Sequence, residues 1–157
     1  MDKHFELTNK FIINAFGVKL FQIKCTRRIK YAEVGDLGGY IEKEDNLSGD
    51  AWVYDNAQVS DNAQVSGDAR VYGNAQVYGN ARVSNNNEHC GFDCFGSANR
   101  HTHAYKTQSG KVEITCGCFR GSIEEFEERV EKTHQGNEFE RQYMAIVEVI
   151  KIKFGLK

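Results

Sequence analysis

Two histidines and two cysteines in the C-terminal part of the chain have the residue types and spacing of a metal or acid–base site. His101 and His103 are separated by one residue, and so are Cys116 and Cys118. Residues 101–107 and 111–118 alternate like the strands of a hairpin. If Ser109-Gly110 forms a two-residue turn, 103 pairs with 116 and 101 with 118, so all four side chains share one face. Such a face could hold zinc.

A one-residue change of the turn gives a different arrangement. If Gln108 joins the loop and Gly110 is left-handed, the register moves by one and the histidines face Glu113 and Thr115. The cysteines instead continue the face of Val112 and Ile114, as buried thiols under the helices that follow. His89, Cys90 and Cys94 offer a weaker version of the same metal chemistry. The spacing is not that of a standard zinc knuckle, so we predict no metal and no cofactor, with zinc as the open alternative.

The elements that position these residues are organised by a repeat of six. An aliphatic residue opens every step of the repeat between residues 41 and 88: Ile41, Leu47, Val53, Val59, Val65, Val71, Val77 and Val83. Alanine follows most of them four residues later, and Gly, Asn and Asp stand between. A unit this short cannot bury its own Val and Ala, so stacked units must form the core. The pattern predicts a parallel β-solenoid, with Asn and Asp before Ala at left-handed corners.

This pattern resembles the hexapeptide-repeat, left-handed β-helix family, in which three hexapeptides form one triangular coil and residues eighteen apart stack. The lead-in, residues 35–42, with Glu44-Asp45-Asn46-Leu47-Ser48 and Ala51-Trp52-Val53-Tyr54, looks like the hexapeptide-repeat proteins of phage, prophage and enteric genomes, among them the YdcK-like proteins. The resemblance covers residues 5 to about 88. It implies the fold and a phage or bacterial origin, but no reaction, since such proteins are often labelled transferases on the repeat alone.

Two flanking modules are expected. Residues 1–40 read as short strands at 5–8, 10–14 and 18–25, which form a β cap over the open end of the solenoid at 41–88. Residues 89–157 read as the hairpin plus two helices, a ββαα module similar to the tail of related phage proteins. Ser122 and Glu125 form a capping box for the first helix. Gly136-Asn137 ends it, and the second helix runs from about 138 to 152.

An enzymatic role is the less favoured alternative. The hexapeptide-repeat acyltransferases, which this repeat resembles, generally use a basic His. No His lies between residues 41 and 88. The sequence therefore predicts no catalytic residue. The alternative is a hexapeptide acyltransferase with His101 or His103 as general base.

A binding role is favoured instead. Stacking at eighteen residues puts Trp52 beside Arg70 and Tyr54 beside Tyr72. These aromatic ladders either stabilise one another or form a contact surface. The candidate binding residues are Trp52, Tyr54, Arg70, Tyr72, Tyr78, Arg82, His101 and His103. The expected protein is a non-enzymatic phage accessory factor that engages a host protein or sequesters a small ligand, with counter-defence as one role, and self-associates as a dimer or trimer.

Composition narrows the remaining classes. The formal net charge is −2 over 157 residues, so no strong polyanion-binding signature arises. A basic cluster at Lys24, Arg27, Arg28 and Lys30 is best explained as a solvated strand edge, and nucleic acid is not expected as a partner. Five cysteines and the lack of a leader or long apolar run predict a cytoplasmic, reduced protein with no membrane partner.

Overall fold

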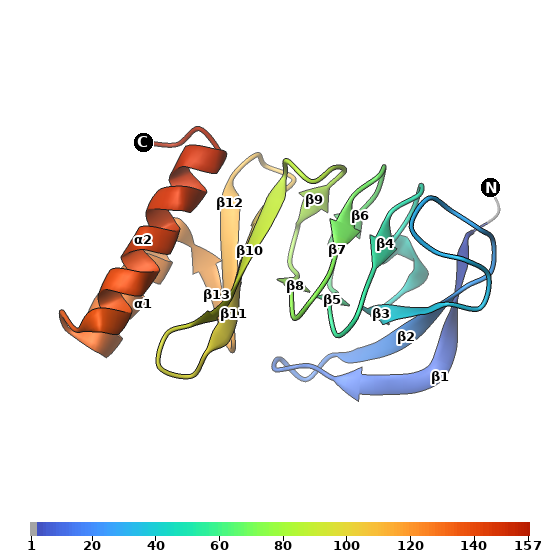
Figure 1. Ribbon diagram of the computed structural model, residues 1–157, viewed down its shortest axis with the longest axis horizontal. Coiled ribbons are helices and arrows are strands. Elements are labelled where there is room, and N and C mark those ends of the chain that lie inside the picture. The colour runs from blue at the N-terminus through green and yellow to red at the C-terminus, as the bar shows by residue number, and fades with distance from the viewer. Residues whose placement is uncertain (1–2) are drawn as a thin grey trace.

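The computed structural model describes residues 3–157 as an elongated molecule with three parts in series (Figure 1). A β-hairpin lies at the N-terminal end, short parallel strands occupy the middle, and a four-stranded sheet with two helices forms the C-terminal end. The sheet stands between the repeat and the helices, so one of its faces covers the last coil and the other packs on the helices.

The middle part is a β-solenoid built from strands of two residues. These strands form three parallel ladders, whose members are β4 (Trp52–Val53) with β7 (Arg70–Val71), β5 (Gln58–Val59) with β8 (Gln76–Val77), and β6 (Gln64–Val65) with β9 (Arg82–Val83). A short 3-10 helix, η1 (Glu44–Asn46), precedes the Leu47–Val65 bridge. Every pair joins residues eighteen apart, which confirms the predicted stacking distance.

The aliphatic openers of the repeat are buried in the solenoid interior, and the chain turns at a fixed position in each six-residue unit. All eight openers of the six-residue units are at most 1% exposed, as the sequence predicts. Positive φ occurs at Asp55, Asp61, Gly67, Gly73 and Gly79, the first residue of each turn pair. The prediction that the Asn or Asp directly before Ala takes this conformation is wrong by one residue. That residue instead donates its N–H to the coil above, as Asn56 does to the Gly73 carbonyl.

The N-terminal segment extends one ladder beyond the repeat. Strands β1 (Phe5–Ile13) and β2 (Lys19–Cys25) pair antiparallel, and β2 pairs with β3 (Leu37–Ile41), which itself pairs parallel with β5. Because β2 occupies the outer edge of β3, it keeps that edge from adding another chain. The two predicted strands at 5–8 and 10–14 are one strand with an irregularity between Leu7 and Phe11.

The C-terminal sheet has twice the predicted number of strands. Its order is β10 (His89–Phe95), β11 (Arg100–Lys106), β12 (Val112–Cys116) and β13 (Phe119–Ser122), all antiparallel. The sequence identified only the central hairpin, because Gly, Asp and Cys in the outer strands hide their alternation. Thr115 donates its hydroxyl to the Gln76 carbonyl at 2.7 Å, which ties the sheet to the solenoid.

The two helices match the sequence closely. Helix α1 (Ile123–His134) begins at Ser122, whose hydroxyl accepts from the Glu125 N–H while the Glu125 carboxylate accepts from the Ser122 N–H. This confirms the capping box. Helix α2 (Glu138–Lys153) begins at Asn137. Both pack on the sheet through Ile114, Phe126 and Ile150. No helix within residues 3–157 is long and apolar enough to cross a membrane.

Candidate functional site

The sheet presents three histidines on the face that looks toward the solenoid. His103 lies opposite Gly91, and His89 lies opposite Tyr105, so residues 89, 91 and 93 share a face with 101, 103 and 105. Tyr105 is part of the hydrophobic core of the solenoid, so the face that carries the three histidines is the one that packs toward the solenoid.

The histidines form a continuous row of hydrogen-bonding contacts. His101 Nδ1 lies 2.6 Å from Asp93 Oδ1, and His101 Nε2 lies 2.9 Å from His103 Nδ1. His103 Nε2 then lies 2.9 Å from His89 Nδ1, and His89 Nε2 lies 3.3 Å from Asn86 Oδ1. We call these five residues the histidine chain. Its two ends are oxygen atoms and its middle is three imidazoles.

Gly91 makes room for the histidine chain. A Cβ at this position would come within 2.6 Å of His101 Cε1 and 2.7 Å of His103 Nδ1. Both distances are below those that Cβ atoms tolerate, so any larger residue would displace the rings. The lack of a side chain at Gly91 therefore lets the imidazoles of His101 and His103 pack against β10.

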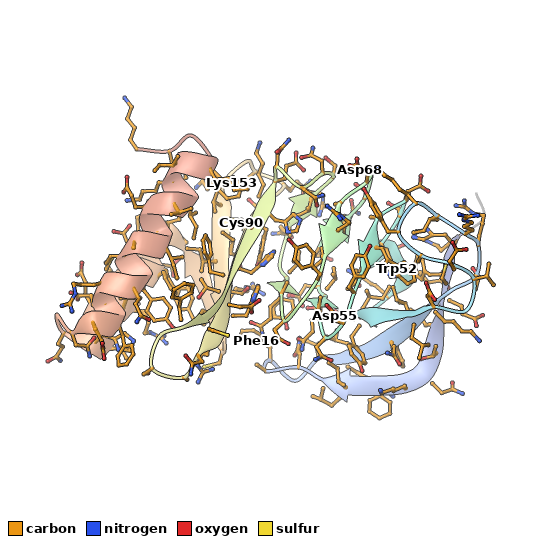
Figure 2. All side chains as sticks on the ribbon, viewed as in Figure 1. Phe16, Trp52, Asp55, Asp68, Cys90 and Lys153 are labelled. Atoms are coloured by element: carbon orange, nitrogen blue, oxygen red, sulfur yellow. The ribbon has the colours of Figure 1, made fainter. Side chains whose placement is uncertain are left out.

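A pocket of about 280 Å³ lies beside the histidine chain. Besides the chain, its lining includes Arg70 and Tyr72 from the solenoid and Lys153 from the end of α2. We call it the junction pocket, since it lies where the solenoid, the sheet and α2 meet. Figure 2 labels Lys153 and Cys90 at this junction. Two of its lining residues, Lys153 and Arg70, are cationic against the single carboxylate of Asp93, so it suits an anion; the Arg70 guanidinium lies at the outer side, on the Tyr31 ring.

Burial keeps the inner imidazoles neutral. It lowers the pKa of His89 to about 4, and the nearby Lys153 ammonium adds to the effect. Burial also holds the pKa of His103 well below its usual value, with the neighbouring His89 and His101 acting in the same direction. Burial raises the pKa of the Cys90 thiol to about 11, so this cysteine is not a thiolate near neutral pH.

The proposed zinc arrangement is wrong. His103 pairs with Thr115, and Thr102 pairs with Cys116, so the one-residue shift is the register that forms. Gly110 has φ of +83°, the conformation that a three-residue turn requires. Cys116 lies among the residues under the helices, on the opposite face from His103, while Cys118 is exposed. Across residues 3–157, no group of three or more His, Cys, Asp or Glu side chains could hold a metal ion.

The predicted aromatic surface is only partly exposed. Trp52 is 2% exposed and Tyr78 is fully buried, so neither can belong to an outward contact surface. His4 covers Trp52, with 5.9 Å between ring centroids, and Phe16 packs edge-on against Tyr78. Tyr72 is 60% exposed and does lie outward.

Three other candidate binding residues, Arg70, Arg82 and Tyr54, contact other parts of the protein. The Arg70 guanidinium lies 5.1 Å from the ring centroid of Tyr31. Tyr54 is half-buried and donates its hydroxyl to the Tyr31 carbonyl at 3.4 Å. Arg82 donates to the carbonyls of Asn62 and Ala81. Of the predicted binding residues, Arg70, Tyr72, His101 and His103 meet at the junction pocket.

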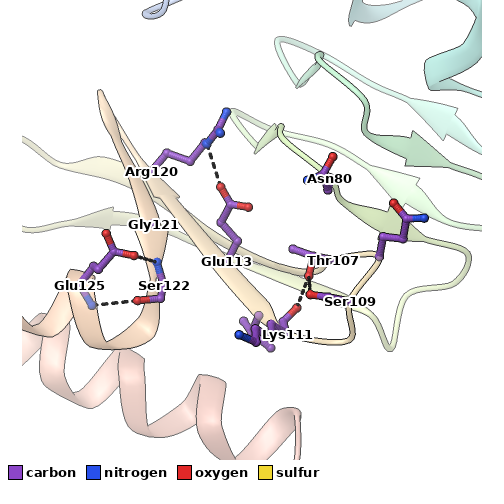
Figure 3. Close-up of a pocket in the computed structure, with 11 residues that line it drawn as sticks. Asn80, Thr107, Ser109, Lys111, Glu113, Arg120, Gly121, Ser122 and Glu125 are labelled. Carbon is purple, nitrogen blue, oxygen red and sulfur yellow. Dashed lines mark hydrogen bonds and ion pairs between the residues drawn. The ribbon is translucent and has the colours of Figure 1, made fainter.

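A second pocket lies on the other side of the sheet edge, between β12, β13 and the start of α1 (Figure 3). Arg120 pairs with Glu113 at 2.8 Å and with Asp61 at 3.0 Å. The lining sets Lys111 and Arg120 against Glu113 and Glu125, and the guanidinium already has two carboxylate partners, so this pocket has no excess of charge to attract a ligand. The junction pocket is therefore the stronger candidate.

A family model supports the repeat. Residues 63–77 and 75–87 match the model described as YdcK Beta solenoid repeat. The chain is a β-solenoid repeat protein. The matched segments hold β6 to β9, the coils next to the C-terminal sheet. No curated protein matches the chain.

Sequence reasoning identified part of the junction pocket. It missed Asn86, Asp93, Gly91 and Lys153, and it treated His89 only as a weak metal ligand. The one available signal was the period of two across His89, Gly91 and Asp93, which places three small or polar residues on one strand face.

Proposed function

We propose that the protein is a non-catalytic binding protein that takes a small oxyanion, such as a phosphate monoester or sulfate, in the junction pocket. The observation that carries this proposal is the placement of Arg70 and Lys153 around a pocket of about 280 Å³ with three histidines in its wall. A pocket at the small end of the usual range suits a small ligand. Charge-assisted hydrogen bonds from Arg and Lys would provide most of the affinity.

Binding of inorganic sulfate and phosphate, measured by isothermal titration calorimetry, tests the proposal. Lys153→Gln should weaken binding about tenfold or more, since a hydrogen bond to a charged group contributes about 1.5–3 kcal/mol, and Arg70→Gln should weaken it less, because the Arg70 guanidinium rests on the Tyr31 ring. Lys132→Gln is the matched control, because this exposed lysine lies on α1 and does not line the junction pocket. Equal affinity in all four proteins would refute the site.

Acyl transfer is less well supported. His101 and His103 lie at the junction pocket, as a general base would, but both ring nitrogens of each are already in contact with another residue of the histidine chain. Neither presents a free lone pair to an acceptor hydroxyl or amine. Thiol release from acetyl-coenzyme A, lost in His103→Gln, would overturn the non-catalytic assignment.

Three broader features belong to the same proposal. The solenoid coil is left-handed, as in the hexapeptide proteins that the repeat resembles. The protein is a phage accessory factor that engages a host protein or sequesters a ligand, counter-defence included.

It self-associates as a dimer or trimer, which the exposed Phe11, Ile13 and Phe16 of the N-terminal hairpin support. Light scattering of Ile13→Lys and wild type tests the last point, and equal masses would refute this contact surface.

A further inference from the structure

The histidine chain has an unusual requirement for hydrogen atoms. It contains four contacts between 2.6 and 3.3 Å, and each needs one hydrogen between its two heavy atoms. A neutral imidazole carries one N–H and one lone pair. Three neutral imidazoles therefore supply three hydrogens for four contacts.

Neither end of the histidine chain can supply the fourth hydrogen. The Asn86 Oδ1 atom accepts the Arg70 N–H at 3.0 Å, and because a backbone N–H can only donate, this contact fixes the amide with its oxygen toward His89. At the other end, the ionised Asp93 carboxylate only accepts. With acceptors at both ends, the fully bonded chain holds one proton more than its neutral imidazoles do.

The count allows the extra hydrogen on any of the three imidazoles, and the Asp93 carboxylate beside His101 favours that ring. His89 donates from Nε2 to Asn86, and His103 donates from Nε2 to His89. His101 donates from Nε2 to His103 and from Nδ1 to Asp93, so it carries both hydrogens. The extra proton thus lies next to the one carboxylate of the histidine chain. His89 and His103 stay neutral, in keeping with their burial.

The surroundings of the histidine chain carry charges of both signs. The charged or titratable groups around it come from β7, the 84–88 loop, β10 and α2: Arg70, Tyr72, Glu88, Cys90, Asp93 and Lys153. Glu88 accepts from the Ser84 N–H and hydroxyl. Arg70 and Lys153 disfavour a further positive charge, whereas an anion in the junction pocket would favour it.

We propose that the histidine chain stores one exchangeable proton on His101 and that the junction pocket binds an oxyanion together with this proton. The stored proton does not depend on the proposed function, whereas the binding of an oxyanion together with this proton rests on it. Loss of the proton would leave one short contact with two facing lone pairs and no hydrogen. An anion beside the histidine chain makes that loss less favourable, and by linkage the bound proton tightens the anion.

Asp93→Asn is the sharpest test, because the amide supplies the missing hydrogen itself. Its N–H can donate to His101 Nδ1, so four contacts are satisfied by three neutral imidazoles and no extra proton is needed. Asp68→Asn is the matched control, since it removes the same charge from an exposed turn of the solenoid that does not line the junction pocket (Figure 2).

Imidazole nitrogen NMR on the ligand-free protein reads the proton directly. In the wild type and in Asp68→Asn, His101 should show two protonated nitrogens near neutral pH, while His89 and His103 show Nε2–H tautomers. In Asp93→Asn all three should be neutral Nε2–H tautomers. Three neutral imidazoles in the wild type, or a doubly protonated His101 in Asp93→Asn, would overturn the stored proton.

Sulfate binding tests the coupling, since sulfate keeps its charge throughout this pH range. At a fixed pH sulfate should increase the population of doubly protonated His101 seen by NMR, and the sulfate Kd should rise by up to about tenfold per pH unit over the range where that population falls. In Asp93→Asn the Kd should not change with pH. Sulfate that binds without changing the population of doubly protonated His101 would refute the coupling and leave the proposed function standing. Lack of sulfate binding at every pH would refute both, while NMR would still decide whether the proton is there.

Discussion

Gly91→Ala isolates the packing requirement of the histidine chain. The new Cβ would lie 2.6 Å from His101 Cε1, 2.7 Å from His101 Nε2 and 2.7 Å from His103 Nδ1. Gly91 does not have positive φ, so alanine brings no backbone strain. In the absence of the rings, alanine would stabilise the strand by about 0.4–1 kcal/mol through the unfolded chain.

Overpacking a buried site costs about 1–3 kcal/mol, which exceeds that gain. The net result is a loss of about 1–2 kcal/mol in the free energy of unfolding, or roughly 2–8 °C in Tm for a chain of this size. Urea unfolding followed by circular dichroism measures it. Gly121→Ala is a strand control in the same sheet, because its Cβ would meet nothing closer than 3.0 Å.

A double-mutant cycle shows whether the rings cause this loss. Two of the three closest atoms belong to His101, so Gly91→Ala should cost little in a His101→Ala background. A cost that is the same in both backgrounds, or a Gly91→Ala protein more stable than wild type, would refute the steric role of Gly91.

Three further predictions concern stability and reactivity. The free energy of unfolding should fall as the pH drops from about 6.5 to about 4, because unfolded His89 and His103 take up protons that their buried, neutral forms resist; urea midpoints that stay constant over this window would contradict this. Val71→Ala, in the solenoid interior, should cost about 2 kcal/mol against a negligible cost for the exposed Val34→Ala, and equal urea midpoints would refute the buried core. An aromatic disulfide reagent should label Cys94 and Cys118 quickly in the native protein, the partly buried Cys90 slowly, and Cys25 and Cys116 only after unfolding, so fast labelling of all five would contradict the burial of Cys25 and Cys116.

The repeat was predictable because its information is local. A valine every sixth residue must face inward wherever the coils stack, and one mistake in period would expose it to water. The capping box at Ser122 and Glu125 was predictable for the same reason, since both partners lie within one helical turn. The outer strands β10 and β13 were not, because their alternation is weak and their pairing partners are fixed by tertiary contacts.

The register of the β11–β12 hairpin shows the limit most clearly. The sequence allowed two turns, and a shift of one residue moves every side chain to the opposite face. In the register that forms, the sheet contacts the solenoid, for example through the hydrogen bond from the Thr115 hydroxyl to the Gln76 carbonyl. That choice separated the histidines from the cysteines and placed them against the solenoid instead.

Sequence alone determined that this chain stacks six-residue units into a solenoid and ends in two capped helices, since periodic burial and capping act between near neighbours. Only the tertiary structure decided that Trp52 and Tyr78 are covered, and that Asn86, His89, His103, His101 and Asp93 form one row beside Arg70 and Lys153. These residues come from four segments, and their contacts depend on how the sheet, the solenoid and α2 pack, which no local pattern specifies.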